Sequence, residues 1–364
     1  MEKKSVMFAV ILIAIFTLMF YSSSSHLVIQ KGHRYSRTSH EFMSLSMPLP
    51  TVKPIANTTN EHKERTSPTL ALTSIPTTQE TTMKYSVVDE QKTRQETLQR
   101  SCSKLHLTRS IPQNDEEFLE FINRTKLFFS DKYKLIACQI PKVGCTNFKK
   151  VLLVAEGLVN ITNPKELSGH VTHDIANRVL QLKNLGDVTE IKRRLNNYYK
   201  VVMVRDPLHR VLSAYRNKFE APDNKYYSKI AREIHLFLSK SNYLKEKSSY
   251  KLSFLEFVKY LNSGDDTYID DPHWDHYYKL CSPCAIKYNF IAKLETVDDD
   301  MNYVMQTVGI QNITYPQNYP VSQRTTDEKV SKYLKGLSNI TKNLITRYKN
   351  DYELFGYSLN NGKS

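Results

Sequence analysis

Residues 134–158 have the sequence KLIACQIPKVGCTNFKKVLLVAEGL, in which a strand-like run, a tight loop and a helix-like run follow one another. The run 135–140 is short and almost wholly apolar, which predicts a buried β-strand. From Phe148 onward apolar residues recur at helical spacing, and Gly157 supplies a stop signal. Between the two runs lies the loop Pro141-Lys142-Val143-Gly144-Cys145-Thr146-Asn147.

This strand–loop–helix junction has the local geometry of an anion site. The N–H groups of the loop and of the helix N-terminus converge on one spot, and Lys142 adds a mobile positive charge there. We therefore predict a site for a phosphate-type or sulfate-type group. The loop is not a Walker A sequence, because the spacing G-x-x-x-x-G-K-[ST] is absent. For this segment taken alone, an ordinary strand–helix turn is the alternative.

A second junction of the same kind begins at residue 199. The strand-like run 199–204 ends in Arg205-Asp206-Pro207. Asp206 is a favourable N-cap and Pro207 suits the first helical position, so a helix is expected to begin there and to carry Ser213. Arg205 is thereby placed at the carboxyl end of a strand, where open α/β sheets bind ligands.

The order of elements predicts an α/β domain with a mainly parallel sheet, because strands alternate with helices. Apolar periodicity and capping residues predict a further strand over 286–294 and helices over 114–122, 191–199, 207–219, 230–238, 253–261, 296–305, 328–337 and 338–352.

The N-terminal segment predicts a membrane anchor. No charged residue occurs between Ser5 and Gln30, and Glu2-Lys3-Lys4 precedes this stretch. The pattern predicts a cytoplasmic tail over 1–5, a signal-anchor transmembrane helix over 6–29 and a lumenal remainder. A cleaved signal peptide is the alternative, since small serines follow the apolar run.

Residues 30–100 are rich in Ser, Thr and Pro, which predicts a flexible lumenal stem ahead of a catalytic domain over 101–364. A small folded domain is the alternative for the stem. N-x-[ST] sequons agree with a lumenal chain and predict surface glycosylation sites at Asn57, Asn123, Asn160, Asn312 and Asn339.

The chain contains five cysteines, and two of them form Cys281-x-x-Cys284. This pair could be half of a zinc site or a redox pair. Because there is a single C-x-x-C and the expected compartment is oxidising, structural disulfides are favoured, with one cysteine left over. The pairing itself stays open.

Two blocks carry a resemblance to a known family. The loop 141–147 and the sequence Val-Arg-Asp-Pro-x-x-Arg-x-x-Ser-Ala-Tyr at 204–215 resemble the Golgi carbohydrate sulfotransferases, within them the branch of the chondroitin and dermatan 4-O-, GalNAc 4-O- and HNK-1 sulfotransferases. Two departures are His209, where the family usually has an acidic residue, and Phe148, where it often has Trp. Further matching blocks follow in order at 273–274, 280–284, 293–296, 324–328 and 354–357.

The resemblance implies a three-layer domain of the P-loop-nucleotide-kinase-like sulfotransferase fold in a type II Golgi membrane protein. It implies 3′-phosphoadenosine-5′-phosphosulfate (PAPS) as the sulfate donor, with no metal. Lys142 would hold the 5′ phosphosulfate and neutralise charge on the leaving oxygen, and Arg205 and Ser213 would take the 3′ phosphate. The implied donor-binding residues are Pro141, Lys142, Val143, Gly144, Cys145, Thr146, Asn147, Arg205, Asp206, Pro207 and Ser213.

Transfer of sulfate to a sugar hydroxyl also requires a general base, and histidine suits neutral pH. The insert between the two junctions contains His170, the first candidate, and His173, the second. His273 is the alternative, and its neighbour Trp274 could stack on a sugar face. The spacing of His170 and His173 could also suggest a metal pair, but no third ligand set accompanies them.

The formal net charge of +14 indicates an acidic partner, for which the expected compartment favours a glycosaminoglycan or glycoprotein glycan over nucleic acid. The basic segments 192–194, 225–229 and 240–251 could line a groove for it or be solvated helix faces. The resemblance favours the 4-hydroxyl of GalNAc in chondroitin or dermatan as acceptor, with the 3-hydroxyl of a terminal glucuronate as runner-up. A lumenal nucleotide-dependent kinase and a glycan-binding protein without catalysis are the alternatives from other classes.

Overall fold

The computed structural model describes residues 86–220, 224–240, 249–264, 271–316 and 324–358. All of them belong to one compact unit, residues 79–364. The expected anchor over 6–29 and the sequon Asn57 lie outside the described residues. Within the described ranges, no helix combines the length and the apolar character needed to cross a membrane.

A sheet of four strands forms the centre of the unit, in the spatial order β1-β2-β3-β4. β1 runs antiparallel to β2, whereas β2, β3 and β4 are parallel, so the expected α/β class with a mainly parallel sheet is confirmed. The carboxyl ends of the three parallel strands meet at one edge, and both predicted junctions follow from that edge. The strands are β1 (Leu127–Ser130), β2 (Leu135–Cys138), β3 (Tyr199–Val204) and β4 (Phe290–Lys293).

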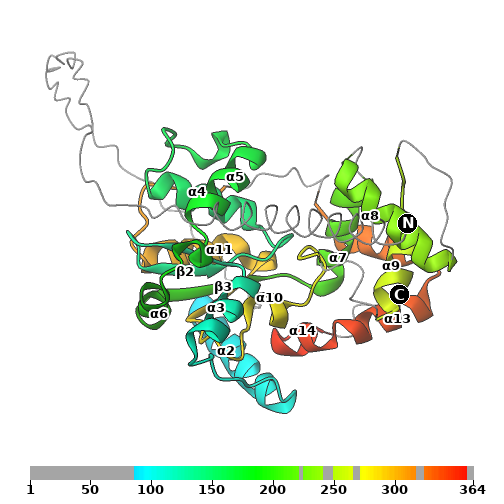
Figure 1. Cartoon of the computed structure of the whole chain (residues 1–364), viewed down its shortest axis with the longest axis horizontal. Helices are drawn as coiled ribbons and strands as arrows, with labels where there is room; N and C mark the ends of the chain where they lie inside the picture. The colour runs from blue at the N-terminus through cyan, green and yellow to red at the C-terminus, as the bar shows by residue number, and fades with distance from the viewer. Residues whose placement is uncertain (1–85, 221–223, 241–248, 265–270, 317–323, 359–364) are drawn as a thin grey trace, which may run out of the picture. The chain divides into compact units, whose positions relative to one another are not determined.

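Helices cover both faces of the sheet. In Figure 1, α4 and α5 lie on one side of it and α2 and α3 on the other. The helices are α2 (Val87–Lys104), α3 (Asp115–Arg124), α4 (Cys145–Ala155), α5 (Gly169–Val179), α6 (Val188–Asn197), α7 (Pro207–Tyr215), α8 (Lys225–Ser239), α9 (Phe254–Asn262), α10 (Tyr277–Cys281), α11 (Val297–Thr307), α12 (Asp327–Leu334), α13 (Ser338–Arg347) and α14 (Lys349–Leu354).

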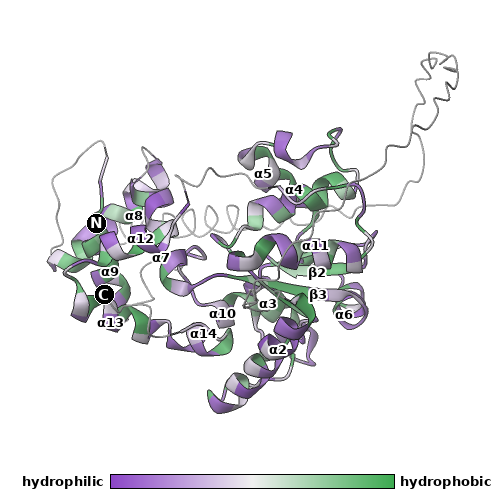
Figure 2. Ribbon diagram, turned by 180° about the vertical axis from the view of Figure 1, so that it is seen from behind, coloured by the Kyte–Doolittle hydropathy of each residue, from purple (hydrophilic) through white to green (hydrophobic). Residues whose placement is uncertain are grey.

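Two apolar cores hold these elements together. The first surrounds the sheet, whose strands are hydrophobic in Figure 2, and it includes fully buried Ile136 and Val202. The second lies among α7, α8, α9 and the C-terminal helices, where Phe257 and Tyr348 are fully buried. The carboxyl edge of the sheet leads from the first core through α7 into the second.

Helix α2 belongs to this folded unit, although its sequence is polar. Gln91 pairs with the edge strand β4 by donating to the Ile291 carbonyl at 2.8 Å and accepting from its N–H at 2.9 Å. Arg94 donates to the same carbonyl and to Asp300 Oδ2, each at 2.8 Å. The expected boundary at residue 101 therefore lies inside a helix that caps the edge of the sheet.

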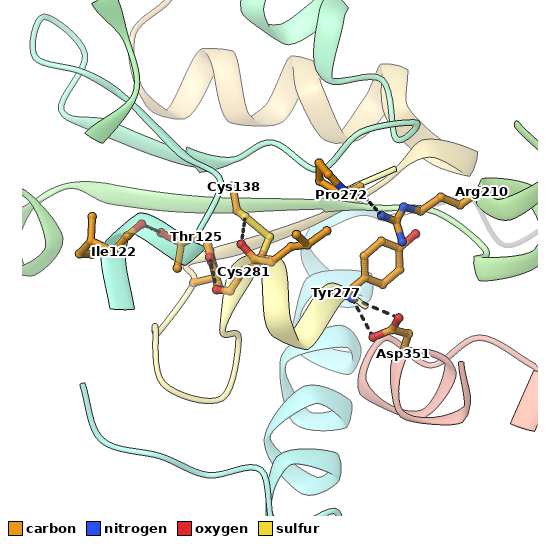
Figure 3. Close-up of a disulfide and its surroundings, with 10 residues drawn as sticks. Ile122, Thr125, Cys138, Arg210, Pro272, Tyr277, Cys281 and Asp351 are labelled. Carbon is orange, nitrogen blue, oxygen red and sulfur yellow. Dashed lines mark hydrogen bonds between the residues drawn. A yellow bond between two sulfur atoms is a disulfide. The ribbon is translucent and has the colours of Figure 1, made fainter. Parts of the chain in front are cut away.

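Two disulfides join distant parts of the chain, Cys102–Cys284 and Cys138–Cys281, and Cys145 is a buried free thiol. The expectation of structural disulfides with one cysteine left over is confirmed. Neither a redox pair nor half of a zinc site exists at 281–284, because each cysteine there is bonded to a different element. Figure 3 shows Cys138, at the end of β2, bonded to Cys281 of α10.

The structure departs locally from the predicted elements. Strand β1 was not predicted. Helix α5 was not predicted either, since its sequence is mostly polar, yet Ser168 caps it by accepting from the Val171 N–H at 3.2 Å. The helix expected over 207–219 ends at Tyr215 and continues as a π-helical turn, η4 (Arg216–Glu220). The sequons within the described ranges are all exposed: Asn123, Asn160, Asn312 and Asn339.

Candidate active site

The loop between β2 and α4 has a left-handed backbone at two positions, Lys142 (φ 73°) and Gly144 (φ 90°). A Cβ on Gly144 would lie 3.1 Å from Leu294 Cδ1, so glycine is favoured here for both conformation and space. Among the described residues, no protein group accepts a hydrogen bond from the N–H of Gly144, Cys145 or Thr146. These donors begin α4, as expected for an anion-binding loop.

Neighbouring segments hold the loop in this shape. The Asn147 side-chain amide donates to the Pro316 carbonyl at 2.7 Å. The Tyr315 hydroxyl lies 3.4 Å from the Gly144 carbonyl, to which it donates. Asn147 is therefore occupied in fixing the loop, and the backbone amides are left for a ligand.

Arg205 connects the two predicted junctions. Its guanidinium is buried and donates to the carbonyls of Lys142, at 3.4 Å, and Thr325, at 2.9 Å. Its own backbone is held by the Tyr277 hydroxyl, which donates to the Arg205 carbonyl at 2.6 Å. Burial lowers the pKa of Arg205, and nearby Glu295 opposes that shift. The sequence predicted Arg205 at a phosphate contact separate from the Lys142 loop. The structure instead places its side chain beside that loop.

Arg210 is a residue whose role the sequence analysis missed. It is 1% exposed and donates to three carbonyls, those of Pro141 at 3.2 Å, Asp275 at 2.6 Å and Pro272 at 2.7 Å. Figure 3 shows it beside the ring of Tyr277, whose centroid is 4.8 Å from the guanidinium carbon. An arginine on the buried face of a predicted helix was the available signal, since such a charge needs partners.

Lys142 lies in a cluster of cations. Burial, together with the charges of Lys218, Arg205 and Arg216, lowers its pKa to about 8, whereas Cys145 acts in the opposite direction. In the ranges the structure describes, no carboxylate forms an ion pair with Lys142. We name Lys142, Arg205, Arg216 and Lys218 the cation cluster. It combines Lys142 of the first junction with Arg205 of the second and with two residues that follow α7, so the two junctions lie side by side.

The start of α7 is capped as predicted. Asp206 Oδ1 accepts from the His209 N–H at 3.0 Å and contacts His209 Nδ1 at 2.9 Å, and Pro207 occupies the first turn. His209 Nε2 lies 2.8 Å from Asp327 of α12. His209 thus joins two carboxylates in place of the acidic residue usual in the family. Ser213 is half-buried on α7, and its hydroxyl forms no hydrogen bond with the described residues.

Two of the candidate histidines lie on α5 next to the loop. His173 Nε2 is 2.9 Å from Thr146 Oγ1, and its Nδ1 is 3.3 Å from Lys149 Nζ. Burial, followed by the charge of Lys149, lowers the pKa of His173 to about 4, so this ring is neutral near pH 7. His170 is exposed in the first turn of α5 and has no such contact with the loop. The structure brings His173, rather than His170, into contact with the loop.

The third candidate, His273, has a carboxylate partner, because its Nδ1 is hydrogen-bonded to Asp271. Trp274 beside it is 3% exposed and packs against Phe257 and Phe219, so the suggestion that it stacks on a sugar is wrong. Among the described residues, no group of three or more His, Cys, Asp or Glu could hold a metal ion.

The predicted basic segments differ in their partners. In α6, Arg194 forms ion pairs with Asp131 at 2.7 Å and Glu190 at 2.6 Å, and Lys192 pairs with Asp115 at 2.8 Å. These charges hold the fold together, so the interpretation of 192–194 as part of a glycan groove is not supported. Residues 225–229 begin α8, directly after the cation cluster, and 241–248 lie outside the described residues.

Comparisons with known proteins identify relatives of this chain. Residues 125–358 match the model of a sulfotransferase family. The chain is 32% identical over 279 residues to human carbohydrate sulfotransferase 9, covering 74% of this chain and 60% of the relative's length. It is 35% identical over 246 residues to mouse carbohydrate sulfotransferase 11, covering 65% and 68% of the two chains. For zebrafish carbohydrate sulfotransferase 14 the identity is 32% over 284 residues, covering 74% and 72%.

No solved structure matches the chain. The family match nevertheless includes β1 to β4, the Lys142 loop, Arg205 and the segment that contains His273. On these matches, the chain belongs to the sulfotransferase family, and its relatives are carbohydrate sulfotransferases.

Proposed function

We propose that this protein transfers sulfate from PAPS to a hydroxyl group of a glycan. The observation that carries the proposal is the cation cluster at the carboxyl edge of the sheet. Lys142 is half-buried there without a carboxylate partner among the described residues, beside loop amides for which no protein acceptor is present among those residues. A half-buried cation of this kind fits a bound anion, because an anion would compensate for the lost hydration.

The residues fit the two anionic ends of such a donor. Lys142 and the N–H groups of Gly144, Cys145 and Thr146 would hold the 5′ phosphosulfate. Arg205 and Ser213, the proposed contacts of the 3′ phosphate, come from the β3–α7 junction. Bound PAPS supplies an activated sulfuryl group, and Lys142 stabilises the negative charge that grows on the leaving oxygen. No metal is part of the proposal.

The proposed acceptor is the 4-hydroxyl of GalNAc in chondroitin or dermatan. It rests on the resemblance of residues 215–219 and 324–328 to that subgroup. In the structure, Tyr215 and Phe219 belong to the second apolar core, and Thr325 accepts from Arg205. We place the approach of the acceptor over α8, because Tyr226 is 61% exposed there next to Lys225 and Lys229.

The proposed location is the Golgi membrane, with a single type II anchor at 6–29 and the catalytic domain in the lumen. Two disulfides support a chain that folds in an oxidising compartment. The four exposed sequons in the described ranges are accessible for glycosylation.

The test is incorporation of labelled sulfate from PAPS into a panel of acceptors: desulfated chondroitin, desulfated dermatan, and an oligosaccharide that ends in glucuronate. We expect transfer to GalNAc without Mg²⁺, and binding of 3′-phosphoadenosine 5′-phosphate (PAP) by calorimetry. Transfer to glucuronate alone would replace the acceptor but keep the reaction. Binding of Mg·ATP without binding of PAP would indicate a kinase, and glycan binding without either nucleotide would indicate a lectin.

A further inference from the structure

The segment that connects α9 to α10 places a carboxylate, a histidine and a tyrosine in one network. The Asp271 Oδ1 atom accepts from the His273 backbone N–H at 2.8 Å and from the His273 ring at Nδ1. The Tyr227 hydroxyl of α8 donates to the other carboxylate oxygen at 3.1 Å. Asp271 is 4% exposed, so it is a buried charge with three partners.

This network determines which nitrogen of His273 carries a proton. Because Asp271 accepts from Nδ1–H, the neutral ring has its lone pair on Nε2. None of the described residues forms a hydrogen bond with Nε2. The ring is thus held in the tautomer of a general base, with the basic nitrogen available.

The network lies next to the cation cluster. Lys218 Nζ is 4.6 Å from the ring centroid of Tyr227, the residue that also binds Asp271. Lys218 and Lys142 are close enough to His273 for their charges to act on it. Lys218 in turn interacts with Cys145 of the donor loop. His273 is therefore a neighbour of the lysine that we assign to the sulfuryl group.

We propose that His273 is the general base that removes the proton from the acceptor hydroxyl, and that Asp271 and Tyr227 are positioning residues that orient it. The inference rests on the proposed sulfotransferase function and gives the base a different identity from His170. Among the described residues, no carboxylate is bonded to His170, so its ring lacks an orienting partner of this kind. The Nε2 and Nδ1 atoms of His173 are both engaged, with Thr146 and Lys149.

The hydroxyl proton moves to His273 Nε2, and the hydroxyl oxygen forms a new bond to sulfur. The bond from sulfur to the bridging phosphate oxygen breaks, and that oxygen keeps the electron pair next to Lys142. The imidazolium that forms is stabilised by Asp271, which stays ionised.

The charged groups around His273 give the reaction a pH dependence. Burial lowers the pKa of His273 below its usual 6.5, Asp271 opposes this, and Lys218 and Lys142 add to it. His173 of α5 also interacts with the ring. A base must be neutral to act, so kcat/KM is expected to rise as the pH passes the pKa of His273, which lies below 6.5. It should then fall as Lys142 loses its proton around pH 8.

The experiment compares His273→Gln and Asp271→Asn with the wild-type chain. We expect His273→Gln to lower kcat by about 10²- to 10³-fold and to remove the acid limb, while the affinity for PAP stays within about threefold. Asp271→Asn removes the charge that raises the pKa of His273, so its acid limb should move to lower pH, with a loss in kcat and little change in acceptor KM. NMR titration of His273 in the protein without nucleotide gives the same shift independently of activity.

His235→Gln is the matched control, because His235 also pairs with a carboxylate, Glu256 at 3.3 Å, outside this network. Thermal melting of each variant checks folding, and Tyr227→Phe offers a milder change to the same network. The proposal is overturned if His273→Gln keeps kcat and the acid limb, or if His170→Gln alone abolishes them. If the wild-type chain binds no PAP and sulfates no acceptor, the proposed function fails as well, and the two failures are thereby distinguished.

Discussion

Gly144 is subject to two constraints at once, a left-handed backbone and a neighbour 3.1 Å from the position of a Cβ. Gly157 shares the first constraint, with φ 74°, but a Cβ there would meet nothing within 4 Å. We expect Gly157→Ala to cost about 1 kcal/mol of unfolding free energy from backbone strain alone. Gly144→Ala should cost about 2–3 kcal/mol, because Leu294 must also move.

Urea unfolding of both variants measures that difference, and PAP calorimetry measures its effect on the site. PAP affinity should fall only in Gly144→Ala, since its neighbours in the loop supply the amides assigned to the donor. Equal losses of stability, or an intact PAP affinity in Gly144→Ala, would contradict the role assigned to this glycine.

Lys142 gives donor binding a defined pH dependence. Its pKa of about 8 in the free protein means that the ammonium loses its proton as the pH rises through that value. A bound dianion favours the charged form and raises the pKa, so PAP binding near pH 8 should take up a proton and weaken at higher pH. Calorimetry in two buffers of different ionisation enthalpy measures this uptake.

Lys142→Arg is the matched variant, because arginine stays charged across this pH range. Between pH 7 and pH 9 the PAP affinity of this variant should stay nearly constant, whereas the affinity of the wild-type chain should fall. Proton uptake that persists unchanged in Lys142→Ala would assign the titration to a different group. Lys142→Ala should also abolish sulfate transfer with little loss of stability.

Local sequence signals predicted part of the site, and the fold supplied the rest. The Lys142 loop and the Asp206–Pro207 helix start were readable because an apolar run, a cap and a breaker lie within a few residues of each other. The approach of Lys218 and the Asp271–His273 pair to the loop depends on how α7, α8 and the segment before α10 pack, which no local pattern encodes.

At the scale of elements, α2 shows how polar contacts can dock a helix. Gln91 and Arg94 both donate hydrogen bonds to the edge strand β4, and Arg94 also forms an ion pair with Asp300. Lys104, in contrast, forms an exposed ion pair with Glu353 at 2.7 Å. Periodicity analysis could not assign α2 to the domain, because the contacts of its buried face are made largely by polar side chains.

Removal of Arg94 should therefore be costly. Arg94→Met leaves the buried carboxylate of Asp300 without its cation, and we expect a loss of about 3–5 kcal/mol in the free energy of unfolding. Lys104→Met, the exposed counterpart on the same helix, should cost less than about 1 kcal/mol. Denaturant unfolding of chains that begin at Gln79 gives both values, and similar losses for the two variants would show that α2 is not docked by the buried pair.

At the scale of the whole molecule, the net charge of +14 is unevenly used. The cations of α6 are paired with Asp131, Glu190 and Asp115, whereas the cation cluster lies at the proposed donor site and the start of α8 on the proposed acceptor side. Net charge alone predicted an acidic partner, but only the structure shows where on the surface the positive charges lie.

Acceptor binding should consequently be sensitive to salt. A polyanionic glycan releases counterions when it binds Lys and Arg, so the acceptor KM should rise steeply between low and physiological salt. PAP binding, which involves fewer charges at short range, should weaken less. Lys225→Ala/Lys229→Ala should flatten the acceptor response and leave PAP affinity unchanged. A flat response in the wild-type chain would favour short neutral oligosaccharides as acceptors.

The disulfide pattern has a consequence for how the protein is made. Cys102 and Cys138 are synthesised early, whereas their partners Cys284 and Cys281 follow 182 and 143 residues later. At ordinary rates of translation the second interval lasts roughly 7 to 29 s, during which the early thiols, with Cys145, can pair only with one another. A premature Cys102–Cys138 bond must then be exchanged before the turn at 281–284 can fasten both α2 and β2. The yield of correctly folded protein should thus be limited by thiol–disulfide isomerase supply, more than by the stability of the finished domain.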